Sequence, residues 1–152
     1  MDPARAREFA ESLHEGEREP DGTLLLAHVW RVAQMVPAEA RAVAWLHEAF
    51  ESNAVSEQDL LMEDLTWDEL RALRLLVRRN DARSDGIYMA LLDLIARAAG
   101  WSGHLARLVT IADLEDRCRH PRVRSNGWSP PYSDGLELLS GARTTSTGRR
   151  VS

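Results

Sequence analysis

Apolar residues recur at helical spacing in almost every segment of this chain, and prolines and glycines separate the segments. Near the N-terminus, Ala6, Ala10 and Leu13 follow a proline at intervals that place them on one face of a helix. We find no alternation of apolar and polar residues of the kind that indicates a strand, and no internal repeat. The sequence therefore predicts an all-α protein.

Capping and breaking residues divide the chain into eight helical segments, two of them short, which we expect to form one compact bundle of about seven helices. Thr66 and Glu69 form a capping box at the start of one helix, and Pro37 ends another. The predicted helices cover residues 3–13, 23–36, 38–52, 56–63, 66–79, 84–100, 102–119 and 134–140. Residues 1–141 are predicted to form the domain, and residues 142–152, with little to bury, a mobile tail.

The composition excludes several classes of function. A chain of 152 residues that is 44% hydrophobic can bury a sizeable core. Its formal net charge of -5 argues against general binding to nucleic acids or membranes, since no overall basic field attracts phosphates. Every basic residue is an arginine, which excludes a catalytic lysine.

The pattern of cysteines and apolar runs is typical of a cytoplasmic protein. Cys118 is the single cysteine and cannot form an internal disulfide, which suits a reducing compartment. The charged N-terminus lacks the apolar region of a signal peptide, and no apolar run reaches the length of a membrane span. We therefore expect a cytoplasmic location.

Polar residues interrupt the apolar faces of three predicted helices. His28, His47 and Asp113 each have a valine four residues away, so each should point inward with it. Glu48 lies about 100° around the helix from His47, so one ion near their shared edge could contact both. The sequence thus predicts that two imidazoles and two carboxylates meet in one core.

A mixed set of nitrogen and oxygen ligands suits a divalent transition metal, with Mn²⁺ expected first and iron, cobalt or zinc as alternatives. The same pattern also fits a structural interpretation. A histidine on an apolar face can be an ordinary core residue, and Asp113 can cap a helix or pair with an arginine.

The order and spacing of these residues resemble the HD family of metal-dependent phosphohydrolases, and within it the branch that hydrolyses the alarmone (p)ppGpp. That branch has H-x-G-Q, a glycine, H-P-x-x-V-A, L-H-D-x-x-E-D and a late A-D-x-x-x-N-x-R. The resemblance covers residues 9–120, and the matching segments here are HEGE at 14–17, Gly22, HVWRVA at 28–33, LHEAFES at 46–52, Leu75 to Arg78 with Tyr88, and Ala112 to Arg119.

The resemblance implies a compact helical bundle and a specific division of roles. His28, His47, Glu48 and Asp113 match the four metal ligands of the family. Glu51 matches the acid that orients or deprotonates the attacking water. The residues at or beside substrate-binding positions are Arg18, Ser52, Tyr88, Arg117 and Arg119.

Several positions depart from the family pattern. Glu48 stands for an aspartate, and Ser52 for the acid that follows the catalytic glutamate. The base-stacking arginine of the alarmone hydrolases falls at Glu19, and their late asparagine falls at Arg117. The metal positions are therefore better preserved than the substrate positions.

Two functions follow from this resemblance. The first is a metal-dependent phosphohydrolase acting on a nucleotide or a related phosphate ester. The second is a degenerate member that binds a nucleotide or a protein partner without turnover.

The arginines of residues 117–124 have two interpretations: they either hold a polyphosphate or form a solvated turn. Arg78, Arg79 and Arg83 are expected on an exposed helix end and loop. His14 is expected at the surface.

Overall fold

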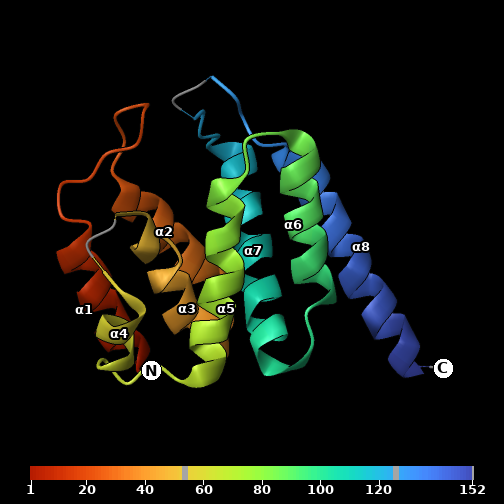
Figure 1. Ribbon diagram of the computed structural model, residues 1–152, viewed down its shortest axis with the longest axis horizontal. Coiled ribbons are helices and arrows are strands. Elements are labelled where there is room, and N and C mark those ends of the chain that lie inside the picture. Colours follow the sequence, from red (N-terminus) through yellow and green to blue (C-terminus); the bar gives the residue numbers. More distant parts are fainter. Residues whose placement is uncertain (53–54, 125–126, 152) are drawn as a thin grey trace.

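The computed structural model describes residues 1–52, 55–124 and 127–151. Within these residues the backbone forms eight α-helices and no strand, which confirms the all-α prediction (Figure 1). The helices are α1 (Pro3–Leu13), α2 (Leu25–Met35), α3 (Arg41–Leu46), α4 (Glu57–Leu61), α5 (Trp67–Val77), α6 (Asp85–Arg97), α7 (Gly100–Arg119) and α8 (Tyr132–Val151). Short 3-10 turns are η1 (Ala38–Ala40), η2 (Ala49–Ser52) and η3 (Arg78–Asp81).

Helix α7 occupies the middle of the bundle. It packs against α2, α3, α5, α6 and α8 (Figure 1). Ten of its residues are buried, among them Asp113, Asp116 and Arg117, so polar side chains of α7 lie inside the protein. Because buried charges are costly unless they are paired or bind an ion, these residues mark the part of the core that requires a chemical explanation.

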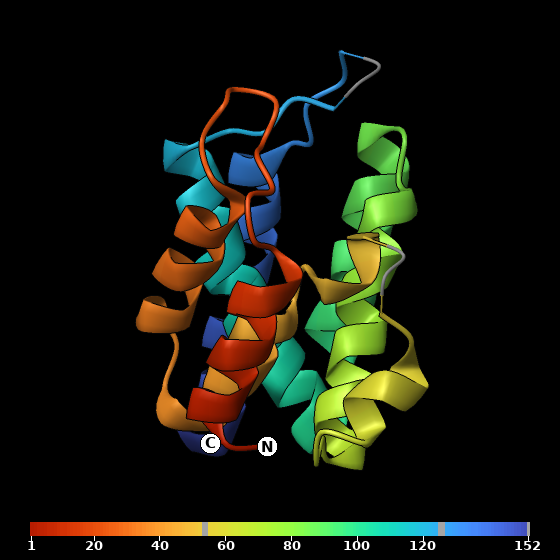
Figure 2. The ribbon, with the colours of Figure 1, turned by 90° about the vertical axis from the view of Figure 1, so that its left-hand side faces the viewer.

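Two irregular segments lie at the same end of the bundle. Residues 14–24 connect α1 to α2, and residues 120–131 connect α7 to α8, within the described ranges (Figures 1 and 2). The C-terminal end of α7 and the N-terminal end of α2 meet beneath them. This end of the molecule is therefore where segments distant in sequence can build a site.

Side-chain caps mark the starts of four of the eight described α-helices. Thr66 and Ser56 form the capping boxes of α5 and α4, and Asp2 caps α1. The predicted start at Ser102 is wrong, because α7 begins at Gly100, where a positive φ of 73° suits glycine.

The predicted helix 38–52 is divided in the structure. A 3-10 turn precedes α3, the α-helix ends at Leu46, and a second 3-10 turn starts at Ala49. His47 is the C-cap residue, and the chain changes direction in the middle of the stretch that carries the polar residues. This break determines where His47, Glu48 and Glu51 point.

Helix α8 is longer than the predicted segment 134–140 and runs to Val151. The mobility expected for residues 142–152 stays a prediction. Among the described helices, none combines the length and the apolar character needed to cross a lipid bilayer.

Candidate metal centre

Four buried side chains from three parts of the bundle meet at one point. His28 comes from α2, His47 and Glu48 from the turn after α3, and Asp113 from α7. One nitrogen or oxygen of each lies within 4.8 Å of the corresponding atoms of the other three. The structure thus brings together the four residues that the sequence predicted to converge, and this group could hold a metal ion.

His28 is oriented by a carboxylate on the far side of its ring. Its Nδ1 lies 2.6 Å from Oδ2 of Asp116, and Arg31 donates a 2.6 Å hydrogen bond to the other oxygen of that aspartate. Burial raises the pKa of Asp116, but His28 and Arg31 outweigh burial and hold it well below its usual range. An ionised carboxylate only accepts, so Nδ1 of His28 carries the hydrogen and Nε2 faces the other three residues. A carboxylate behind the ring is common in metal-binding histidines.

His47 is oriented by the end of its own helix. Because α3 stops at Leu46, the carbonyl oxygen of Ala44 can accept a 2.6 Å hydrogen bond from Nδ1 of the His47 ring. A carbonyl cannot donate, so the hydrogen again lies on Nδ1. The Nε2 lone pair of His47 therefore points toward the same centre as that of His28.

The resulting arrangement places acceptors opposite one another. The Nε2 atoms of His28 and His47 lie 3.2 Å apart, and Oδ1 of Asp113 lies 2.9 Å and 3.6 Å from them. Oδ1 is buried and has no hydrogen bond of good geometry among the described residues. Facing lone pairs repel unless a cation lies between them. Metal–ligand distances of about 2.0–2.2 Å separate neighbouring ligands of one ion by about 3 Å, so this spacing fits a bound metal.

A proton can play the same part when no metal is bound. Burial lowers the pKa of His28, but interactions with Asp113 and Asp116 outweigh burial and raise it to about 9. Metal ligands must be deprotonated, so a metal that binds at neutral pH has to displace this proton.

The two oxygens of Asp113 face different partners. Oδ2 accepts a 2.7 Å hydrogen bond from Nη1 of Arg79, and Oδ1 faces the histidines. Burial opposes ionisation of Asp113, but the charge of Arg79 and the close contacts with His28 and His47 outweigh burial and keep the pKa of Asp113 well below its usual range. The two sequence interpretations of this aspartate, as ligand and as arginine partner, are compatible.

Glu51 lies next to Glu48 and shares an arginine with it. Burial and the negative charge of Glu48 raise the pKa of Glu51 to about 8. Burial alone would raise the pKa of Glu48. A hydrogen bond from Glu51 and the nearby histidines outweigh burial and lower this pKa. Nη1 of Arg122 donates a 3.2 Å hydrogen bond to Glu51 and lies 3.6 Å from Oε2 of Glu48. Glu51 is thus a group that can exchange a proton near neutral pH.

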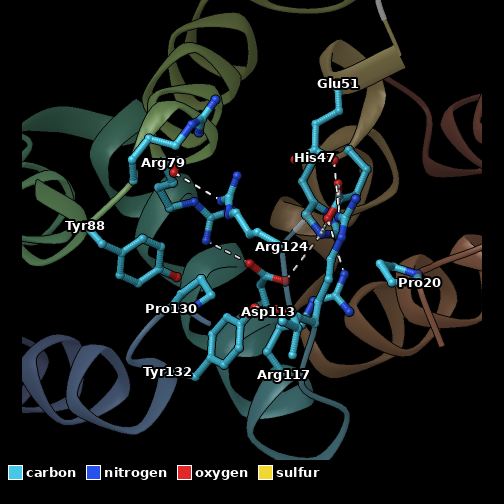
Figure 3. A pocket seen from close by; sticks show the side chains of 14 residues that line it. Pro20, His47, Glu51, Arg79, Tyr88, Asp113, Arg117, Arg124, Pro130 and Tyr132 are labelled. Carbon is cyan, nitrogen blue, oxygen red and sulfur yellow. Dashed lines mark hydrogen bonds and ion pairs between the residues drawn. The ribbon is translucent and has the colours of Figure 1, made fainter. Parts of the chain in front are cut away.

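A cavity of about 400 Å³ opens above these residues (Figure 3). Five arginines and three carboxylates line it, so its wall is positive although the whole chain carries -5. The lining residues are Pro20, His47, Glu48, Glu51, Arg79, Arg83, Tyr88, Asp113, Arg117, Arg122, Val123, Arg124, Pro130 and Tyr132. Such a wall suits an anion.

The residues predicted to bind substrate are distributed unevenly around this cavity. Tyr88 and Arg117 line it (Figure 3). Arg18 is exposed, bonds a backbone carbonyl of its own loop, and is not part of the lining. Arg119 is exposed and also lies outside the lining. The side chain of Ser52 is outside the described part of the chain. The substrate-binding roles of all five residues stay predictions.

A buried ion pair stands where the alarmone hydrolases have their base-stacking arginine. Oε1 of Glu19 lies 2.6 Å from Nη2 of Arg117, and both side chains are almost entirely buried. Burial lowers the pKa of Arg117, but Glu19 and the nearby acids outweigh it and raise it. Glu19 is therefore paired with Arg117, and only Arg117 of the two lines the cavity.

Sequence reasoning missed several residues of the site. The expectation that Arg79 is exposed is wrong, because η3 extends α5 and turns this side chain inward, leaving 5% of it exposed. His14 was expected at the surface but is buried beside Glu17. Asp116 could have been found, since it follows Asp113 by three residues on one helix.

Comparison with known proteins adds no relative. No model of a protein family matches the chain, and a search of curated proteins finds no significant match.

Proposed function

We propose that this chain is a metal-dependent phosphohydrolase of the HD type that acts on a nucleotide or a (p)ppGpp-like pyrophosphate. One observation carries the proposal: four ligand atoms within 4.8 Å of one another lie under a cavity with five arginines in its wall. Mn²⁺ is the proposed ion, because the ligands are a mixture of imidazole and carboxylate.

The protein's own residues supply the remaining chemistry. A divalent cation at this site supplies Lewis-acid chemistry, which makes a nearby water more acidic and draws charge from a phosphoryl oxygen. The pKa of Glu51 is raised to about 8 by burial and by the charge of Glu48, and a cation that balances Glu48 would favour the ionised form of Glu51, which accepts the proton of the attacking water. Arg122 and Arg124 in the cavity wall bind the phosphate and the charge that develops on the leaving group.

The charge of the cavity supports a substrate with several negative charges. Five arginines exceed three carboxylates by two, and a divalent cation would raise this excess to four. Guanidinium groups bind phosphate oxygens in pairs, which favours phosphates over carboxylic acids of equal charge. Tyr88 and Tyr132 add aromatic surface on the same wall, where a base or sugar could pack.

A second candidate, binding without turnover, is favoured by the same geometry. Arg122 forms an ion pair of 3.2 Å with Glu51, the proposed proton acceptor. Ser52 replaces the acid that assists this glutamate in the alarmone hydrolases. A protein held in this state would bind a metal and an anion and release no product.

Metal analysis and turnover measured on the same preparation test the proposal. Purified protein is assayed for bound Mn²⁺ and for release of phosphate or pyrophosphate from a panel of nucleotides. Glu51→Gln should keep the metal and lose turnover, whereas the exposed Glu115→Gln should change neither. Metal binding without turnover of any substrate would support the second candidate, and Ser52→Asp should then increase hydrolysis. No stabilisation by any divalent ion would overturn both.

A further inference from the structure

Three arginines of the cavity wall are held in different ways. The side chains of Arg79 and Arg117 are 6% and 4% exposed, and they form short ion pairs of 2.7 Å with Asp113 and 2.6 Å with Glu19. Arg117 also lies 3.7 Å from Oε1 of Glu48. The side chain of Arg122 is 32% exposed, and its Nη1 lies between two carboxylates, 3.2 Å from Glu51 and 3.6 Å from Glu48. Arg122 is therefore held less tightly than the other two.

The contact of Arg122 with Glu48 is one of charge alone. At 3.6 Å it is too long for a hydrogen bond, and Oε2 of Glu48 has none among the described residues although it is buried. Oε1 of the same carboxylate faces the histidines at 3.5 Å and 3.7 Å. A cation bound by the histidines would therefore compete with Arg122 for the charge of Glu48.

The backbone beneath Arg122 is fixed while its side chain reaches into open space. Tyr132 donates a 2.8 Å hydrogen bond to the carbonyl oxygen of Arg122. The side chain extends from this anchor into the cavity, where five arginines line the wall. Rotation about side-chain bonds alone could move the guanidinium from the carboxylates to an anion in the cavity.

We propose that Arg122 is an exchangeable counter-ion that links the cation site to the anion site. Without a cation it balances the charge of Glu48 and donates a hydrogen bond to Glu51. When a cation takes the charge of Glu48, the guanidinium becomes available to a phosphate in the cavity, so cation and anion bind cooperatively. This inference rests on the proposed function, because it assumes that the four ligands bind a metal.

Calorimetric titration with Mn²⁺, in sulfate and in chloride of equal ionic strength, tests the coupling without turnover. Sulfate is the probe because it has the shape of phosphate and binds Mn²⁺ weakly in solution, which a blank titration corrects. In the unmodified protein, sulfate should strengthen Mn²⁺ binding by about tenfold, within the usual range of coupling between two sites. In Arg122→Gln, Mn²⁺ in chloride should bind more tightly than it does to the unmodified protein. The ratio of the Mn²⁺ affinities in sulfate and in chloride should fall to about one.

Two further variants separate the role of Arg122 from that of charge in general. Arg122→Lys should keep part of the coupling, because an ammonium neutralises carboxylates but binds sulfate through fewer hydrogen bonds. Arg71→Gln removes a charge from an exposed position on α5 and should leave the coupling unchanged.

The outcomes distinguish this inference from the function on which it rests. Unaltered coupling in Arg122→Gln, or no coupling in the unmodified protein, would overturn the role of Arg122 and leave the metal site standing. No binding of Mn²⁺ to the unmodified protein would overturn both. If Arg122→Gln fails to fold, the titrations of the unmodified protein and of Arg122→Lys still decide the question.

Discussion

The floor and the wall of the cavity are built on different principles. The floor consists of the four candidate ligands His28, His47, Glu48 and Asp113, which lie on or directly after helices α2, α3 and α7. Three of them are supported from behind, by a carboxylate, a carbonyl and an arginine. Part of the wall comes from the described residues between α7 and α8, where Arg122 reaches back to Glu48 and Glu51. In the proposed site, the geometry of the ligands therefore depends on helices, whereas selection of an anion would depend on a less regular segment.

Removing a ligand from the floor should have the largest effect. Asp113→Asn keeps the shape of the side chain but removes its charge, so Mn²⁺ binding should fall below detection by calorimetry. The variant should remain folded, with a circular dichroism spectrum like that of the unmodified protein. Asp93→Asn, on a surface ion pair with Arg97, is the matched control. Micromolar Mn²⁺ binding retained by Asp113→Asn would contradict its role as a ligand.

Removing the support behind the floor should destabilise the protein. Arg79→Met leaves Asp113 ionised and buried without its partner, and breaking a buried pair costs about 3–5 kcal/mol. Urea unfolding in the presence of a chelator measures this loss. Added Mn²⁺ should restore part of it, because a cation again balances the carboxylate. Equal losses with and without Mn²⁺ would show that Arg79 and the metal do not act on the same charge.

The floor was more predictable than the wall for a physical reason. His28 and Asp113 lie in helices whose apolar spacing shows which face is buried, so their inward direction follows from local periodicity. His47 was also placed correctly, although the helix around it ends earlier than predicted. Where a residue lies on a regular helix, a single sequence is enough to predict whether its side chain points into the core.

The wall depended on contacts between distant segments, which periodicity does not describe. Arg122 meets Glu51 across 71 positions in the chain, and Arg79 meets Asp113 across 34. Arg79 was assigned to an exposed end because its inward turn arises from a 3-10 extension rather than from an apolar pattern. The pairing of Glu19 with Arg117 was missed because it joins two segments that are distant in sequence.

A smaller effect should follow from disturbing the residue behind His28. Asp116→Asn weakens the contact that fixes the hydrogen on Nδ1, and loss of such a partner typically reduces metal affinity by 10–100-fold. The reduction should appear in the dissociation constant for Mn²⁺, with the number of bound ions unchanged. Asp134→Asn, an exposed residue in the first turn of α8, is the control. An unchanged dissociation constant would show that the ring is held without this carboxylate.

A dependence of stability on pH is also expected, because both Glu51 and His28 titrate between acid and mildly basic pH. The pKa of Glu51 is raised from 4.5 to about 8 and that of His28 from 6.5 to about 9. Both groups hold their proton more tightly in the folded state. Their contributions to stability are therefore complete below the lower value of each pair and are lost as pH rises through the higher value.

Urea unfolding of the metal-free protein between pH 5 and pH 9, in steps of about one unit, should thus show a free energy of unfolding that falls as pH rises. Glu51→Gln should flatten this decline below about pH 6.5, reduce its slope between about pH 6.5 and pH 8, where His28 also contributes, and leave the decline above about pH 8 to His28. Glu48, Asp113 and Asp116 have lowered pKa values, so their contributions are lost only at more acid pH and do not enter this window. Saturating Mn²⁺ should remove the contribution of His28, because the ion takes the place of its proton. A decline that persists unchanged in Glu51→Gln would mean that Arg122 keeps this glutamate ionised at neutral pH, and the wall, rather than the floor, would then control the proton acceptor.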